Sequence, residues 1–298
     1  MPDKLLSMAE AVERVESMRA RPELTLARRS LGAPAARSLL LTVLGEFVLD
    51  HAEPVWNQGL IRALVALGIR EVTARQAITR SAAEGWLEPD RVGRQTRWRL
   101  SAPTRELLLR GRERIYGFEG ICKGWDGRWL VVMVRVPEGR REHRHRVRTR
   151  LAWAGFGSLG RGVWITPHLE REREALEALR DLGPSAQATS FLAHHGSIGG
   201  EQELVVAAWG GLDRLDGLYR GFIEAFARLR PRGPEEVFVA QARLVHQWRG
   251  FPFLDPGLPA PLLPPGWSGV RAGEVFRCRH HRWAAPARAW FGATVPAA

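Results

Sequence analysis

A helix, a glycine and a second helix follow one another in the first third of the sequence, and this order constrains the fold more than any other feature. The first helix is predicted at 57–67, where apolar residues recur at helical spacing, and Gly68 ends it. The second is predicted at 74–84 and ends at Gly85. Because each helix has one apolar face, the pair needs a further helix to cover it. The apolar stripe at 38–49 predicts that helix.

Capping and turn residues surround this pair. Asn57 and Thr73 are expected to cap the two helices, because their side-chain oxygens can accept hydrogen bonds from free backbone N–H groups. Two short strands are predicted after the second helix, at 86–87 and 97–100. The segment between them is rich in turn residues, with Gly93 at its centre.

The second helix has two chemically different faces. Its inner face is small and apolar, so it can pack closely against other helices. Its outer face carries arginine and glutamine, which can pair bidentately with guanine and adenine in the major groove, and the hairpin carries more arginines. We expect DNA contacts from Thr73, Arg75, Gln76, Thr79 and Arg80 on the helix, and from Arg91, Arg94, Gln95, Thr96 and Arg97 on the hairpin. The alternative is an ordinary helical core with a solvated charged face.

The charge balance agrees with a polyanionic partner. The formal net charge is +12 and the sequence pI is about 11.2, and such a positive field attracts nucleic acid. A GC-rich coding bias towards arginine, alanine and glycine gives the same balance, so the placement of the arginines matters more than their number. The two cysteines, Cys122 and Cys278, are too few for a disulfide framework or a cysteine-rich zinc finger.

No membrane span or leader is expected. The longest apolar run, 38–49, is interrupted by Glu46 and is shorter than the ~20 residues that cross a bilayer. The N-terminus shows no apolar signal-peptide core. We therefore predict a cytoplasmic protein.

The pattern of elements predicts an α+β multidomain chain. Between 121 and 210, the predicted order β-α-β-α-β-β suggests a ferredoxin-like sandwich, with its last strand at 203–209. Helices are expected at 235–249 and 272–282, around a proline-rich loop at 251–267. The predicted segments are an N-terminal extension (1–33), a winged helix domain (34–101), a linker helix (102–120), the ferredoxin-like domain (121–210) and a helical C-terminal domain (211–298).

Several motifs resemble those of a known family. They are Leu44–Val48, Val55–Trp56, Ala74–Arg80, Glu84–Leu87, Gly93–Leu100, Trp125–Trp129, Ala242–Arg249 and Phe251–Pro259. In these motifs the chain resembles the PaaX-like repressors of phenylacetate catabolism, and the resemblance covers about residues 35–282.

The resemblance implies a homodimeric repressor with an N-terminal winged helix-turn-helix, a Cas2-like middle domain and a helical C-terminal domain. It implies an inverted-repeat operator in front of an aromatic-acid catabolic operon. It also implies release from DNA by an aryl-acetyl-CoA such as phenylacetyl-CoA, or a related acyl-CoA, and no resident cofactor. Trp248, Phe251 and Phe253 are candidate lining residues of an effector pocket between the middle and C-terminal domains, with Arg249 near an anionic group. The alternative for each aromatic residue is core packing.

A Cas2-like fold also raises the alternative of a metal-dependent nuclease. Such an enzyme needs a carboxylate at the end of the first strand of the middle domain, because Mg²⁺ prefers oxygen ligands. The sequence has Arg135 there, so we expect no enzyme activity.

Two histidine-containing segments are poor metal sites. His143 and His145 lie among arginines, which repel a cation. The helix that carries them is a solvated or dimer-facing surface, a second nucleic-acid patch or a contact for acyl-CoA phosphates. Cys278, His280 and His281 do not have the spacing of a zinc site, so we expect a structural role.

Overall fold

The computed structural model describes residues 35–51, 53–118, 124–137, 139, 141–180 and 187–293. The predicted N-terminal extension lies outside these residues. The chain is α+β and forms two compact units, each assembled from separate stretches of sequence. The first unit contains the described residues within 1–118, 224–250 and 274–298, and the second contains those within 119–223 and 251–273.

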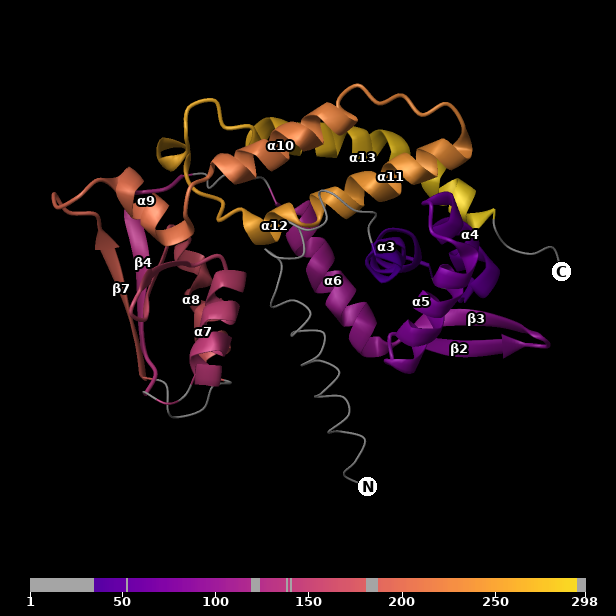
Figure 1. The fold of residues 1–298 in the computed structure, drawn as a ribbon, viewed down its shortest axis with the longest axis horizontal. Helices are drawn as coiled ribbons and strands as arrows, with labels where there is room; N and C mark the ends of the chain where they lie inside the picture. Colours follow the sequence, from indigo (N-terminus) through magenta and orange to yellow (C-terminus); the bar gives the residue numbers. More distant parts are fainter. Residues whose placement is uncertain are drawn as a thin grey trace. The chain divides into compact units, whose positions relative to one another are not determined.

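The N-terminal part of the first unit consists of helices around one apolar core and a hairpin that projects from them (Figure 1). Its elements are α3 (Ala36–Val43), a π-helical turn η1 (Leu44–Val48), β1 (Val55–Trp56), α4 (Asn57–Ala66), α5 (Glu71–Ala83), β2 (Leu87–Val92), β3 (Gln95–Leu100) and α6 (Ala102–Tyr116). The three strands form an antiparallel sheet in the order β1-β3-β2. Gly68 and Gly85 end α4 and α5 with positive φ angles of 91° and 77°, a conformation that glycine adopts without strain.

Both predicted caps of this region are wrong. Helix α5 begins at Glu71, so Thr73 lies inside its first turn. Asn57 makes no capping hydrogen bond, and its Oδ1 accepts a hydrogen bond of 3.1 Å from Nε1 of Trp98. The hairpin is also longer than predicted, because β2 and β3 remain paired as far as Val92 and Gln95.

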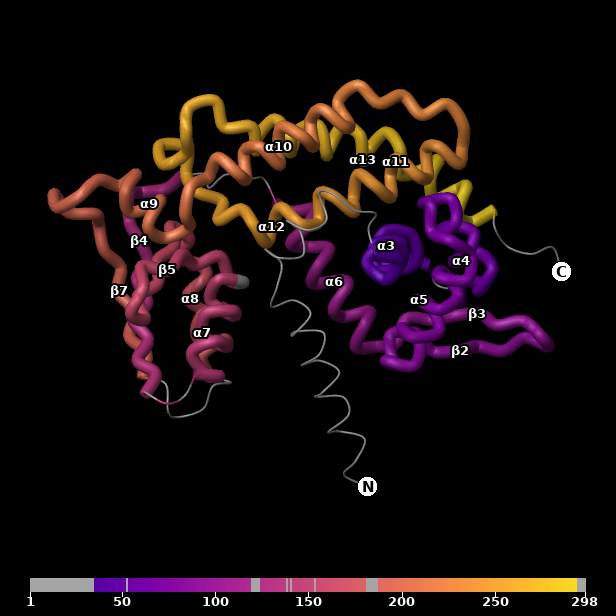
Figure 2. Tube along the Cα trace, viewed as in Figure 1, coloured from indigo at the N-terminus to yellow at the C-terminus, as the bar shows by residue number. Residues whose placement is uncertain are grey.

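C-terminal helices complete the core of the first unit. Helix α11 (Pro234–Trp248) runs beside the second part of α13 (Gly269–Gly292), as the traces in Figure 2 show. The ring of Phe238 on α11 lies 4.9 Å from that of Phe47 and 4.4 Å from that of Trp290 on α13. The N-terminal module therefore shares its buried surface with segments some 200 residues later in the chain.

The second unit contains a four-stranded antiparallel sheet in the order β5-β6-β4-β7. Its elements are β4 (Arg128–Arg135), α7 (Arg141–Trp153), β5 (Gly157–Gly160), β6 (Val163–Thr166), η2 (Leu169–Arg171), α8 (Glu172–Arg180) and β7 (Gln187–His194). This β-α-β-β-α-β order is the ferredoxin-like topology. Helices α7 and α8 cover one face of the sheet through Val147, Leu151 and Ala175 (Figure 1).

The expected strand at 203–209 is wrong, because this segment forms helix α9 (Glu201–Trp209). The Glu203 side chain accepts a hydrogen bond from the backbone N–H of Gly200, which helps to start the helix. Val205 of α9 packs against Trp129 and Ile165 on the other face of the sheet. Strand β5, which was not predicted, supplies the fourth strand.

The remaining elements are α10 (Asp213–Phe226), α12 (Phe251–Leu254) and η3 (Ala260–Leu262). The proline-rich segment is mostly irregular, as predicted, while α13 is about twice as long as the predicted helix at 272–282. None of the helices in the described part of the chain is both long and apolar enough to cross a membrane.

Candidate nucleic-acid interface

The inner face of α5 is buried by small residues, as predicted. Ala74, Ala77, Ile78 and Ser81 are each at most 7% exposed. Because these side chains are short, α5 packs closely against α3 and α4. Its opposite face is left for solvent or a ligand.

The outer face presents four polar side chains, Arg75, Gln76, Thr79 and Arg80, and all are exposed. Nε and Nη2 of Arg75 lie 3.0 and 2.6 Å from Oε1 of Glu71. The Thr79 hydroxyl donates to the backbone oxygen of Arg75. An exposed ion pair contributes little stability, so Arg75 can exchange Glu71 for a base edge at small cost. Thr73, in the first turn of the helix, is half-buried.

The predicted hairpin residues fall into two groups. Arg91, Arg94 and Gln95 are exposed near the turn, where Gly93 has a φ of 58°. Thr96 is half-buried and pairs with Arg91 in the sheet.

Arg97 has partners within the protein. Its Nη2 lies 2.7 Å from Oδ2 of Asp90, and its guanidinium lies 5.3 Å from the centre of the Trp56 ring. Arg97 therefore stabilises the middle of the hairpin in this structure, while Arg91 and Arg94 are the exposed cations nearer its tip.

Contacts with the helices fix the orientation of the hairpin. The Arg37 guanidinium lies 4.4 Å from the centre of the Trp86 ring and forms an ion pair with Glu84. Together with the hydrogen bond from Trp98 to Asn57, this contact joins α3, α4 and the hairpin.

The sequence interpretation missed three residues of this surface. Arg70, just before α5, and Arg99, on β3, are both exposed, and Nη2 of Arg99 lies 3.8 Å from Oδ2 of Asp90. Glu71 was also missed, although its position four residues before Arg75 is the spacing of a helical ion pair.

Comparison with known proteins identifies the family. The PaaX-like protein profile matches residues 35–104, the PaaX central Cas2-like domain matches 122–205, and the PaaX-like C-terminal domain matches 209–293. The chain belongs to the PaaX-like family. It is 29% identical over 249 residues to the transcriptional repressor PaaX of Escherichia coli strain K12. The match covers 80% of this chain and 77% of the E. coli protein.

A solved structure also shares the fold. An uncharacterized protein from Mycobacterium tuberculosis, Rv0674, matches with a TM-score of 0.56 and 24% identity. The match covers 85% of this PaaX-like chain and 96% of the Mycobacterium chain.

Two of the candidate effector residues are engaged in the core of the first unit. Trp248 is 1% exposed, stacks on Phe276 at 4.6 Å and donates from Nε1 to the backbone oxygen of Ile115. Nη2 of Arg249 donates to the backbone and hydroxyl oxygens of Ser38. These contacts fit a packing role, and a role of the two residues in effector binding stays a prediction.

The other two candidates belong to the second unit. Phe251 is 5% exposed and stacks on Tyr219, with ring centres 4.2 Å apart. Phe253 is half-buried. Their role in effector binding stays a prediction.

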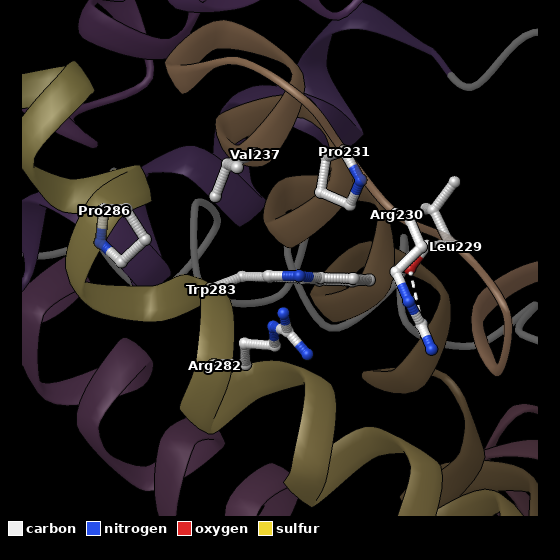
Figure 3. A pocket seen from close by; sticks show the side chains of 7 residues that line it. All are labelled: Leu229, Arg230, Pro231, Val237, Arg282, Trp283 and Pro286. Carbon is white, nitrogen blue, oxygen red and sulfur yellow. Dashed lines mark hydrogen bonds between the residues drawn. The ribbon is translucent and has the colours of Figure 1, made fainter.

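The first unit contains a small cavity of about 170 Å³ (Figure 3). It is lined by Leu229, Arg230, Pro231, Val237, Arg282, Trp283 and Pro286. The Trp283 ring lies across it, with Val237 and Pro231 on one side and Arg282 on the other (Figure 3). Since a cavity of about 150 Å³ accommodates benzene, this space suits one ring and not a whole CoA thioester.

Of the residues with possible metal chemistry, Arg135 lies on β4, and Cys278 and His280 lie on α13. Arg135 ends β4 and is exposed, and its neighbour in β7 is Gln187. Nε2 of His280 lies 3.0 Å from Oε1 of Glu46, and Cys278 is exposed. Within the described residues, no three His, Cys, Asp or Glu side chains are grouped as metal ligands.

Proposed function

We propose that this chain is a sequence-specific transcriptional repressor that reads duplex DNA with an N-terminal winged helix-turn-helix, and that it is not an enzyme. The observation that carries the proposal is the division of α5 into a small, buried inner face and an outer face of exposed Arg75, Gln76 and Arg80. A recognition helix needs both properties, because it must pack tightly on its own domain and leave bidentate donors free for the major groove. The relationship to the E. coli repressor supports it.

In this proposal the β2–β3 hairpin is the wing. Arg91 and Arg94 project near its turn and would contact phosphates, or the minor groove where it is narrow. Phosphate contacts of this kind fix the register of the helix on the duplex, while α5 supplies the sequence preference.

The repressor would act as a homodimer on an inverted repeat, in the cytoplasm. Strand β7 is an edge strand, and its Phe191 and Leu192 are 53% and 54% exposed. Exposed apolar side chains on an unpaired edge are typical of a surface that another chain covers. Two winged helices would then reach half-sites about one helical turn apart, or multiples of it.

The regulated genes would be those of aromatic-acid catabolism, and the effector an aryl-acetyl-CoA or a related acyl-CoA. The cavity beside Trp283 has room for the ring of such a ligand, and Arg230 and Arg282 carry charges that complement its anionic groups. Trp248, Arg249, Phe251 and Phe253 remain candidate contacts. A ligand causes the repressor to release DNA only if it binds more tightly to a conformation of the protein that no longer fits the operator.

The test of DNA binding uses fluorescence anisotropy with the protein's own upstream region. Arg75→Ala should weaken binding by ~1–3 kcal/mol and relax the preference for one base pair. Arg243→Ala, which removes the same charge from an exposed site on α11, is the matched control and should bind like the wild type. Equal affinity of Arg75→Ala and the wild type would contradict the proposed recognition helix.

The effector is tested separately by thermal shift and by DNA release with phenylacetyl-CoA, other acyl-CoAs and free CoA. Binding to the folded state raises the melting temperature in a concentration-dependent way. The absence of any shift with all acyl-CoAs would reject this class of effector and leave DNA binding intact.

A further inference from the structure

Exposed arginines gather at one end of the sandwich in the second unit. Arg135 ends β4, Arg141 begins α7, and Arg161 lies in the turn between β5 and β6. The backbone N–H of Val134 donates to the oxygen of Gly162 at 2.8 Å, which places the end of β4 beside that turn. Three separate elements therefore bring a cation to the same end of the domain.

Helix α7 extends this group along one flank. Nη1 of Arg150 donates to the backbone oxygen of Ala178, so this residue marks the flank that faces α8. At 3.6 residues per turn, Arg141, Arg144 and Arg148 lie about 120° to 180° around the axis from Arg150. All three are exposed. Helix α7 also contacts β5, which is an edge strand of the sheet. The arginine flank therefore lies on the side of β5 and of the turn between β5 and β6.

This arrangement lowers the stability of the elements that carry it. Like charges three and four residues apart disfavour a helix, and the single acid of α7, Glu142, pairs with Arg146 instead. Arg161 has a φ of 47° and is the one non-glycine residue with a positive φ among those described, at a position where glycine is less strained. Local features that oppose folding indicate selection for another role.

We propose that these residues bind the phosphate backbone of duplex DNA outside the sequence that α5 reads. We call Arg135, Arg141, Arg144, Arg148 and Arg161 the second-unit arginine cluster. The inference rests on the proposed function and adds a contact that carries no sequence preference.

The chemistry favours an extended polyanion. Guanidinium groups match phosphate oxygens in a bidentate geometry. From Arg141 to Arg148 the helix rises about 10 Å, which corresponds to about three phosphates along the axis of one strand. Such a row suits a phosphodiester backbone better than a compact ligand, which needs convergent groups around a cavity.

The experiment compares two duplexes over a range of salt concentrations. The short duplex contains only the operator, and the long one extends it by about two helical turns (~20 base pairs) on each side. The variants are Arg144→Ala/Arg148→Ala and Arg161→Gly, the second of which removes a cation and relieves the positive φ. The control is Arg173→Ala/Arg214→Ala, which removes two exposed arginines outside the cluster in the same unit.

On the long duplex, the slope of log K against log[salt] should become shallower by about 0.9 for each arginine that contacts a phosphate. The short duplex and the control should show wild-type slopes. Wild-type slopes for both cluster variants on the long duplex would overturn the proposal. If these slopes stay unchanged and the variants also lose the acyl-CoA response, the cluster binds a small anion instead of DNA. Failure of the proposed function is seen independently, as wild-type binding of Arg75→Ala to the short duplex.

Discussion

Nε2 of His280 lies 3.0 Å from Oε1 of Glu46, although 234 positions separate the two residues. Glu46 is 5% exposed, on the π-helical turn that follows α3. Nε2 of Gln241 donates to the same carboxylate oxygen at 2.8 Å, and the hydroxyl of Tyr116 donates to the other. One buried carboxylate, on the turn that follows α3, therefore connects the N-terminal helices to α6, α11 and α13.

Removing this carboxylate should destabilise the first unit. Glu46→Ala leaves the buried Gln241 and the half-buried Tyr116 and His280 without their acceptor, so we expect a loss of about 3 to 5 kcal/mol in the free energy of unfolding. Hydrogen exchange of peptides from α3 and α11 measures it locally, since a chain with two units need not unfold in one step. Glu224→Ala, at an exposed position, is the control and should change stability by less than about 0.5 kcal/mol. If the α3 and α11 peptides of Glu46→Ala exchanged hydrogen as slowly as those of Glu224→Ala, the hydrogen-bond network around Glu46 would add no stability.

Because of the same carboxylate, we expect the first unit to lose folding stability at acid pH. Burial raises the pKa of Glu46, but the hydrogen bond and charge of His280, with hydrogen bonds from Tyr116 and Gln241, outweigh it and hold the pKa below its ordinary value. A carboxyl group of this kind stabilises the fold above its unfolded-state pKa of about 4.3, and the contribution is lost as the pH falls through the folded pKa. Urea unfolding followed by circular dichroism should therefore show a steeper loss below about pH 4.3 in the wild type than in Glu46→Gln. Parallel profiles would assign the acid limit to other groups.

The two faces of α5 could be predicted from the sequence because they depend on helical period and side-chain chemistry, which are local. The network around Glu46 could not. In the sequence Glu46 is an acid that interrupts an apolar run, and its partners lie 70 to 234 positions away. Only the packing of α6, α11 and α13 against the N-terminal helices brings Tyr116, Gln241 and His280 to it.

Helix α9 shows a different reason why the sequence did not predict the structure. A short apolar run such as Leu204–Val206 fits a strand and a buried helix equally well by period. Tertiary contact decides, because one side of the segment packs on the sheet at Trp129 and Ile165. The expected ferredoxin-like sandwich was nevertheless found, since the glycine-rich segment at 157–160 provides the missing strand.

The hairpin arginines should separate into two functions. Arg94→Ala removes an exposed cation near the tip, so it should reduce the salt dependence of DNA binding by a slope of about 1 and leave stability unchanged. Arg97→Ala removes the partner of Asp90 and of the Trp56 ring, so it should mainly lower the melting temperature. Anisotropy titrations at several salt concentrations and thermal unfolding of both variants distinguish the two. If Arg97→Ala loses DNA binding with a wild-type melting temperature, then Arg97 leaves Asp90 to contact DNA.

Glu71 should restrain the recognition helix. Its carboxylate pairs with Arg75 and adds a negative charge to the proposed DNA-binding surface. Glu71→Gln should therefore tighten operator binding several-fold, because an exposed ion pair is worth up to about 1 kcal/mol. The double variant Glu71→Gln/Arg75→Ala is the control, since the gain depends on a released Arg75. Weaker binding by Glu71→Gln alone would mean that Glu71 positions Arg75 productively.

The second unit should respond to pH in the opposite direction from the first. Asp255 is buried, and it accepts hydrogen bonds from the Tyr219 hydroxyl at 2.6 Å and from the N–H of Gly257 at 2.7 Å. Burial raises the pKa of Asp255 to about 6, and these hydrogen bonds only partly oppose it. The unfolded-state value is about 3.9, so between these two values the folded state binds more protons than the unfolded state.

Stability from this group is therefore present below about pH 3.9 and is lost as the pH rises through about 6. Asp255→Asn keeps the size of the side chain and removes the titration, so the decline between pH 4 and 6 should flatten in that variant. Tyr219→Phe removes a donor that lowers the pKa, so it should extend the decline to higher pH. Urea midpoints for the second unit, measured across this range by circular dichroism, test both variants. A wild-type midpoint that rises with pH from 4 to 6, with the same slope in Asp255→Asn, would show that Asp255 is ionised in the folded protein throughout.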